Sequence, residues 1–363
     1  MIQIDMDCEG PITQNDNAFE LCEAFLPKGG DFFARVSKYD DFLADIEKRP
    51  GYKAGDTLKL VLPFLLASGV DIQVMRDFSL KTLVVLPGAE DMLSFLVSRF
   101  SSFIISTSYR PYLDALSMRT GFASKNIYCT ELGDDIPLPN SEERSLLQRL
   151  AREIVEQPIL KWPDGLISAR ELSNEEQKLV KRLDQIFWEI LPQMPTAAVC
   201  YAINTVGGRE KAVALQDSLK RTGNAISQVL YAGDSITDVQ ALELVRNSGG
   251  VAISFNGNAY AVRSCDYMCT GHTPVIIAAI AQIVAEKGVS GLNELLRRGP
   301  LVGSKLLEVL GENGVEAQLI SWMEPYTPSL ALYRVTPENM EYALGRSEYV
   351  RKEVRGGQIA ELG

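Results

Sequence analysis

The feature that most constrains the fold of this sequence is a repeated order of short apolar strands and amphipathic helices. Runs typical of buried strands lie at residues 2–6, 103–105, 198–203, 229–232 and 251–255, and helical segments separate them. This order predicts an α/β fold with one doubly wound, mainly parallel sheet that carries helices on both faces. Ligands of such sheets bind beyond the carboxyl ends of the strands, so residues that follow the strands are the first candidates for a functional site.

Long insertions separate the strand-bearing pieces of the 363-residue chain. The helical spacing of apolar residues inside these insertions predicts lobes that pack beside the sheet. The predicted parts are a core at 1–14, 86–130 and 197–285, a helical cap at 15–85, a second insertion at 131–196, and a mainly helical C-terminal extension at 286–363.

The composition disfavours several classes of partner. The chain has 47 acidic and 36 basic residues, a net charge of −11, and such a surface repels nucleic-acid backbones and anionic membranes. The most apolar stretches, 58–70 and 275–285, are shorter than a membrane span and predict buried helices, so we expect no direct membrane insertion. The sequence lacks a signal-peptide pattern, and its six cysteines lack disulfide spacing, which predicts a cytoplasmic protein.

Two acids, Asp5 and Asp7, stand where the first strand ends. One carboxylate at such a position could attack phosphorus, while the other protonates the leaving oxygen. Taken alone, this short acidic motif is equally typical of a solvated turn.

Hydroxyl and basic side chains follow two further strands. Ser106 precedes a helix and could hold a phosphoryl oxygen together with backbone N–H groups, with Thr107 as the alternative if the strand runs one residue longer. An ordinary helix cap is the other explanation. Lys211 lies in the first turn of the helix after Gly207-Gly208, where a cation is unfavourable unless it neutralises an anion. An exposed surface lysine is the alternative.

A third acidic motif follows the apolar run at 229–232. Asp234 and Asp238 lie four residues apart at a strand-to-helix turn. Carboxylates in this setting suit Mg²⁺, which prefers oxygen ligands. Helix-capping acids are the alternative.

In their order and strand context, these motifs resemble those of haloacid-dehalogenase-like phosphatases. The resemblance implies that Asp5 is the nucleophile and a metal ligand, and that Asp7 is the general acid and base whose carbonyl also binds the metal. It further implies that Ser106 and Lys211 bind the phosphoryl group. Asp234 ligates the metal in this scheme, and Asp238 ligates it or supports its ligands.

The resemblance covers the core pieces only, and it implies a magnesium-dependent phosphohydrolase that acts on a small phosphorylated metabolite through an aspartyl-phosphate. Dehalogenases of the same superfamily lack the second acid, so Asp7 favours phosphate chemistry. The cap is expected to close over the site and to select the substrate while it excludes water.

A narrower resemblance leaves a second function open. The segments 7–12 and 15–20 resemble an archaeal group of the same superfamily described as energy-converting hydrogenase A subunit R. This likeness implies a non-catalytic accessory or regulatory subunit as the alternative. Glu9-Gly10-Pro11 also departs from the Gly-Thr that follows the second acid in many relatives.

Cys265, Cys269 and His272 could be soft metal ligands, but their spacing fits no common zinc site and a fourth ligand is missing. Packing beside a strand is the better explanation of the two cysteines. His272 is the only histidine, which excludes histidine-based triads. The sequence leaves the oligomeric state and the identity of the substrate open.

Overall fold

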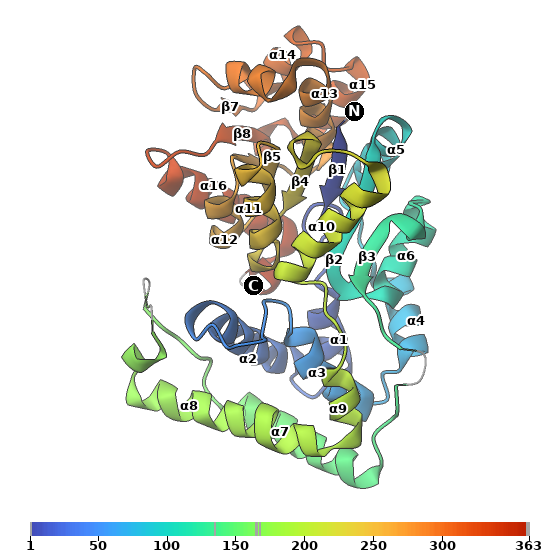
Figure 1. The fold of residues 1–363 in the computed structure, drawn as a ribbon, viewed down its shortest axis with the longest axis vertical. Coiled ribbons are helices and arrows are strands. Elements are labelled where there is room, and N and C mark those ends of the chain that lie inside the picture. The colour runs from blue at the N-terminus through green and yellow to red at the C-terminus, as the bar shows by residue number, and fades with distance from the viewer. Residues whose placement is uncertain (1, 134–135, 164–165, 167, 361–363) are drawn as a thin grey trace.

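The computed structural model describes residues 2–133, 136–163, 166 and 168–360 (Figure 1). These residues form an eight-stranded sheet in the order β3-β2-β1-β4-β5-β6-β8-β7. The strands are β1 (Gln3–Met6), β2 (Ser101–Tyr109), β3 (Ile127–Thr130), β4 (Val229–Gly233), β5 (Val251–Phe255), β6 (Tyr267–Thr270), β7 (Leu301–Val302) and β8 (Ala331–Arg334). The first six strands pair in parallel, and only β8 pairs antiparallel, with β6 and β7. The predicted α/β fold with a mainly parallel sheet is confirmed.

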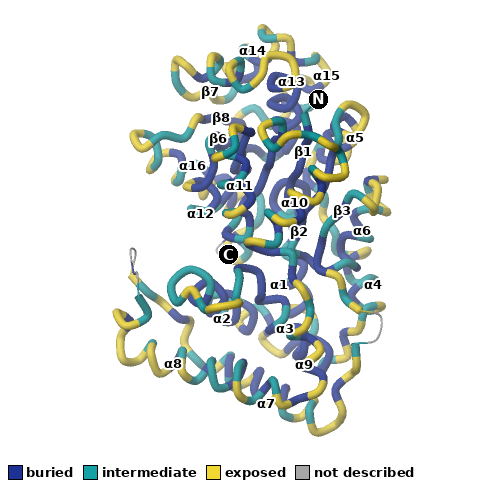
Figure 2. The backbone as a smooth tube through the Cα atoms, in the orientation of Figure 1, coloured by how far each residue is buried: buried dark blue, intermediate teal, exposed yellow. Residues whose placement is uncertain are grey.

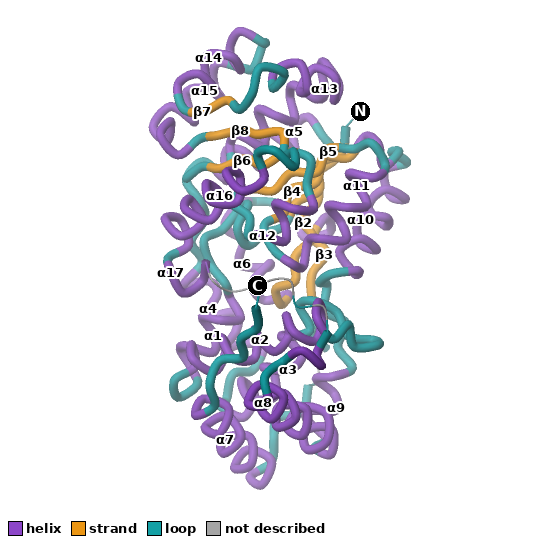
Figure 3. The backbone as a smooth tube through the Cα atoms, turned by 90° about the vertical axis from the view of Figure 1, so that its left-hand side faces the viewer, coloured by secondary structure: helices purple, strands orange, loops and turns teal. Residues whose placement is uncertain are grey.

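Helices cover both faces of this sheet (Figure 3). One face packs against α5 (Ala89–Arg99), α6 (Arg110–Thr120), α13 (Val275–Leu295), α14 (Ser304–Glu312) and α15 (Ala317–Met323). The other face packs against α10 (Arg209–Thr222), α11 (Val239–Asn247), α12 (Ala259–Ser264) and α16 (Met340–Arg355).

The side chains of β1 alternate between these two faces, as the pleat of a strand requires. Ile4 and Met6 are buried in the apolar cluster that contains α5 and α13. Gln3 and Asp5 therefore point to the opposite face, which α10 covers. The strands at the centre of the sheet are buried along their length (Figure 2).

Helix α13 is, among the described residues, the one helix long and apolar enough by itself to cross a membrane. Its first ten residues, 275–284, are all buried in the core of this structure. Core helices commonly have this composition, and the buried helix predicted for residues 275–285 is confirmed.

The two insertions pack together into one cap below the core in Figure 1. The first supplies α1 (Asn17–Phe25), α2 (Gly29–Asp41), α3 (Thr57–Ala67) and α4 (Ile72–Thr82), and the second supplies α7 (Ser141–Glu156), α8 (Asn174–Asp184) and α9 (Pro195–Tyr201). Their apolar faces share a single cluster of buried residues. In it, the Phe64 ring lies 4.8 Å from that of Phe32 and 6.3 Å from that of Phe187.

The strand predicted at 198–203 is wrong, because this segment belongs to α9 and to the loop after it. Pro195 occupies the first turn of the helix, where its fixed φ is favourable. Ala197 and Cys200 are buried in the apolar cluster of the cap. The chain therefore returns to the core only after α9.

The described part of the C-terminal extension is mainly helical, and it also adds two short strands, β7 and β8, which extend the sheet beyond β6. The chain then runs back along the sheet as α16, which contacts β6 and α12, and ends in α17 (Gly357–Ala360). This return brings the last described residues to the junction of core and cap (Figure 1).

Candidate active site

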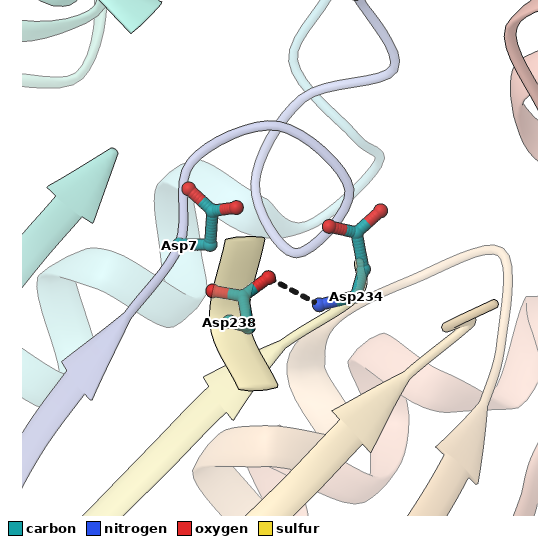
Figure 4. A group of neighbouring side chains, drawn as sticks. All are labelled: Asp7, Asp234 and Asp238. Carbon is teal, nitrogen blue, oxygen red and sulfur yellow. Dashed lines mark hydrogen bonds between the residues drawn. The ribbon is translucent and has the colours of Figure 1, made fainter. Parts of the chain in front are cut away.

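Three buried carboxylates meet beyond the carboxyl ends of β1 and β4 (Figure 4). Oxygen atoms of Asp7, Asp234 and Asp238 all lie within 4.8 Å of one another. Asp7 follows β1 directly, and its N–H donates to the carbonyl of Ala232 at 2.9 Å. Because β1 and β4 are adjacent and parallel, the residues that follow them fall at the same edge.

Lys211 bridges two of these three carboxylates, those of Asp7 and Asp238. Its Nζ is 2.7 Å from Asp7 Oδ2 and 2.7 Å from Asp238 Oδ1, and its side chain is fully buried. Burial alone would lower the pKa of Lys211, but Asp238 and Asp7 outweigh burial and raise this pKa above its ordinary value. The lysine is therefore a fixed positive charge, and it is not the exposed surface residue that the alternative explanation required.

Asp238 organises the loop after β4. Its Oδ1 accepts from Lys211 and from the Tyr231 hydroxyl at 2.8 Å. Its Oδ2 accepts from the N–H groups of Asp234 at 3.0 Å and Ser235 at 3.1 Å. Asp238 has both oxygens engaged and does not line the cavity, so it is suited to support a metal site. Asp7 and Asp234 line the cavity and are the better-placed ligands.

The position of Asp7 raises its pKa to about 7. Burial is the largest cause, Lys211 opposes it, and Asp238 and Asp234 add to it. Buried anions need compensation by opposite charge, so a cation beside Asp7 and Asp234 would favour the ionised form. The donor set, which consists of carboxylate oxygens, fits a hard ion such as Mg²⁺.

Asp5, the predicted nucleophile and metal ligand, lies elsewhere. It belongs to β1 itself, paired with Phe103 and Tyr231, and its side chain points under α10. There it accepts from Gln3 Nε2 at 3.0 and 3.1 Å and from Ser218 Oγ at 2.8 Å. Asp5 is therefore not in the described carboxylate group, because β1 ends one residue later than Asp5 and buries it in the sheet.

Glu9 is a site residue that the sequence reasoning missed. It lines the same cavity as Asp7, and its Oε1 accepts from the N–H of Asn17 at 2.7 Å. Burial, followed by the charge of Asp16, raises the pKa of Glu9 well above its ordinary value. The signal was present, because Asp7-Cys8-Glu9 repeats the spacing of Asp5-Met6-Asp7 one step further along.

The backbone at position 10, directly after the acid pair of Asp7 and Glu9, requires a glycine. Its φ is +103°, and a Cβ atom there would lie 2.5 Å from both Cγ and Oδ2 of Asp234. Only glycine allows the backbone of the loop after β1 to approach Asp234 this closely.

The hydroxyl residues of β2 follow the alternative prediction, because the strand extends to Tyr109. Thr107 and Ser108 line the cavity. Ser106 is buried, and its Oγ donates to Ser108 Oγ at 3.2 Å. Among the described residues, Thr107 Oγ1 is buried without a hydrogen-bond partner.

The cap closes the site from the opposite side. The cavity between core and cap has a volume of about 100 Å³, and Phe33, Asp40, Asp41 and Leu58 form part of its wall. This volume is far below the roughly 300–1,000 Å³ that is usual for small-molecule pockets. The cavity therefore has space for a group the size of a few water molecules.

Two arginines of α16 complete the site, and the sequence reasoning named neither. Arg351 and Arg355 both line the cavity and both donate to Oδ2 of Asp234, Arg355 at 2.9 Å. Six carboxyl groups line the cavity against these two guanidinium groups. Burial raises the pKa of several of them, that of Asp7 and that of Asp40 to about 7, and a bound cation would favour their ionised forms.

The cysteine and histidine residues do not form a second metal site in the described parts of the chain. All six cysteines are buried and free, and no group of potential metal ligands contains one. His272 is part-exposed and lies 3.3 Å from Glu353. Packing accounts for Cys265 and Cys269, each buried in a different apolar cluster.

Comparisons with known proteins give a structural likeness. No family model matches the sequence, and no curated protein matches it significantly. The structure of gene product AF1437 from Archaeoglobus fulgidus aligns over 100% of this chain and 99% of its own, with a TM-score of 0.79 and 27% identity. A substrate-bound phosphoserine phosphatase covers 74% of this chain and 91% of its own, with a TM-score of 0.42 and 11% identity. A phospho-aspartyl intermediate analogue of phosphoserine phosphatase gives the same values.

Proposed function

We propose that this protein is a magnesium-dependent phosphohydrolase that acts on a small phosphomonoester through an aspartyl-phosphate intermediate. The observation that supports the proposal is the buried group of Asp7, Asp234 and Asp238 around Lys211, at the edge of a parallel sheet where ligands bind. Phosphoryl transfer depends on positioning and charge neutralisation, and this group offers both.

Asp7 is the nucleophile in this proposal, in place of Asp5. Its carboxylate faces the cavity, and Lys211 holds it in a fixed position at 2.7 Å. An oxygen of Asp7 attacks phosphorus while the bond to the leaving oxygen breaks, which leaves the phosphoryl group on the carboxylate. Water then hydrolyses this acyl phosphate, which releases inorganic phosphate and regenerates the carboxylate of Asp7.

Asp7 and Asp234 would hold Mg²⁺, with Asp238 as support, and Ser106, Thr107 and Lys211 are retained as candidates for phosphoryl binding. The arginines occupy Oδ2 of Asp234, which leaves Oδ1 for the ion. When bound, the ion would neutralise charge on the phosphoryl oxygens. Thr107 offers a buried hydroxyl without another partner and is the stronger of the two hydroxyl candidates.

Glu9 acts as general acid and then as general base. Burial and the charge of Asp16 raise its pKa well above the ordinary value, which favours the protonated form that a general acid requires. It lies two residues from Asp7, on the loop that Gly10 brings against Asp234. Glu9 would protonate the leaving alcohol and later take a proton from the attacking water.

A phosphatase screen of the purified chain tests the proposal. The protein is incubated with a panel of metabolite phosphates, with Mg²⁺ and with chelator, and released phosphate is measured. We expect magnesium-dependent turnover of at least one small phosphomonoester, with accumulation of a phosphorylated Asp7 peptide in the Glu9→Gln variant. No turnover across the panel by folded protein would contradict the proposal, and co-purification with a membrane complex would then favour the accessory-subunit alternative.

A further inference from the structure

We propose that α16 is a strap that ties the entrance of the cap to the candidate site, and that Arg355 is its positioning residue. The proposal concerns a part of the chain outside the parallel core and the cap insertions. The expected effect of this strap on Mg²⁺ binding rests on the proposed function, whereas its role in holding the cap connections does not.

Arg355 joins the two regions through three separate contacts. Its Nη1 donates to Asp234 Oδ2 at 2.9 Å. Its Nε donates to the carbonyl of Gln14 at 3.3 Å, and its Nη2 donates to the carbonyl of Asn15 at 2.6 Å. The side chain is 6% exposed, so these contacts are made away from bulk water.

Gln14 and Asn15 are the point where the chain leaves the core and enters the cap. The segment that leads from the cap back to the core is hydrogen-bonded to the same two residues through Thr82 and Val84. Gln14 N–H donates to the carbonyl of Val84 at 3.0 Å, and the N–H of Val84 donates to Asn15 Oδ1 at 2.8 Å. Asn15 Nδ2 also donates to the carbonyl of Thr82 at 3.0 Å. Arg355 therefore holds both connections of the first insertion, and it holds them against Asp234.

Arg351 anchors the strap one helical turn earlier. It is 2% exposed and pairs with Asp234 Oδ2. Its Nη1 also reaches the carbonyls of Asp234 at 3.2 Å and Asn256 at 3.3 Å, and its Nε donates to the carbonyl of Ala360 at 3.2 Å. Two guanidinium groups thus fix the carboxylate of Asp234 in one orientation, as outer partners of metal ligands commonly do.

The contacts of Arg355 require arginine and not merely a positive charge. A guanidinium group presents five N–H donors in a planar fork, and here three different nitrogens reach three acceptors. Lysine has a single ammonium group, which cannot span these acceptors at once. The Arg355→Lys variant therefore keeps the charge beside Asp234 and removes the bridge.

The test compares Arg355→Lys with Lys352→Arg in the full chain. Lys352 lies on the same helix, paired with Glu348 at 3.0 Å on an exposed face, so this swap is matched in charge and size. Backbone hydrogen exchange is measured in metal-free protein at residues 14–17 and 82–86, and Mg²⁺ binding is measured by calorimetry. Melting temperature and circular dichroism report whether each variant folds.

We expect Arg355→Lys to raise exchange at both cap connections by about tenfold or more and to weaken Mg²⁺ binding roughly 10–100-fold, at a melting temperature close to that of the parent. Lys352→Arg should change neither. The proposal is overturned if Arg355→Lys leaves exchange and Mg²⁺ affinity within about twofold of the parent. If the parent itself binds no Mg²⁺, the proposed function fails, and the exchange measurement still decides whether the strap exists. If Arg355→Lys does not fold, Arg355→Gln is measured in the same way.

Discussion

The choice between Asp5 and Asp7 as the nucleophile can be tested with two isosteric variants. Asp7→Asn removes the carboxylate beside Lys211, and Asp5→Asn removes the carboxylate beneath α10. Each variant replaces one buried, part-protonated acid with a neutral amide of the same shape, because burial raises both pKa values to about 7. The two changes are therefore matched in size, charge and burial, and they differ in which group they remove.

The structure allows the expected magnitudes to be estimated. Asp7→Asn replaces the Asp7 carboxyl group with a neutral amide and keeps the 2.7 Å Lys211–Asp238 pair, so the fold should survive. Loss of the nucleophile should lower kcat about 10⁴-fold or more, which corresponds to roughly 5.4 kcal/mol of barrier. Asp5→Asn should leave kcat within about threefold, because the described hydrogen bonds of the Asp5 carboxylate go to Gln3 and Ser218, away from the group of Asp7, Asp234 and Asp238.

Steady-state hydrolysis of a substrate found by the phosphatase screen, at saturating Mg²⁺, provides the assay, and thermal melting confirms that both variants are folded. The reasoning is refuted if Asp7→Asn keeps more than about one hundredth of the parental kcat. It is also refuted if Asp5→Asn loses as much activity as Asp7→Asn, since that would make Asp5 part of the reacting group.

Two further variants and one pH dependence follow from the geometry. Glu9→Gln should lower kcat about 10²–10⁴-fold for an alkyl phosphate and much less for p-nitrophenyl phosphate, whose leaving group needs no proton; equal losses in the two assays would contradict a general acid. Gly10→Ala should abolish Mg²⁺ binding in calorimetry, because its Cβ would lie 2.5 Å from the Asp234 carboxylate; parental affinity would show that the loop can shift. Burial raises the pKa of Asp5 from 3.8 to about 7, so its protonated form stabilises the fold at low pH, and the parent should lose stability relative to Asp5→Asn as pH rises from about 4 to about 7. The difference should reach at most about 4 kcal/mol by chemical denaturation, and a pH-independent difference would argue against the raised pKa.

The sheet could be predicted from the sequence because its strands are short, apolar and separated by periodic helices, a pattern that few architectures share. The strand prediction at 198–203 was wrong because short apolar runs are compatible with both strands and helices. A short apolar run has no period of its own, and tertiary packing against α3 decided in favour of a helix.

The candidate site was partly predictable. Lys211, Asp234 and Asp238 follow from their places after Gly207-Gly208 and after β4, and the structure brings them together with Asp7. The structure places Asp7, and not Asp5, in the carboxylate group. The sequence left this choice open because overlapping acid pairs begin at Asp5 and at Asp7 and the strand end could not be fixed to one residue. Gly10 was the informative residue, since a glycine directly after the second acid singles out the later pair.

Arg351 and Arg355 could not be predicted in this way. Their spacing of four places them on one face of a helix, which is common on any charged helix surface. What buries them is the return of the chain through β7, β8 and α16, and no local pattern encodes that path.

The shared apolar cluster of the cap has a consequence for how this protein can be rearranged. Neither insertion has a complete hydrophobic interior of its own, because Phe64 of the first packs on Phe187 of the second. The cap is built from two separate segments of the chain, so it cannot be deleted, transferred to another protein or expressed as one continuous segment. A version of the protein without the cap would need both insertions to be removed together. Removal of either one alone would leave the other with an exposed apolar surface that is prone to aggregation.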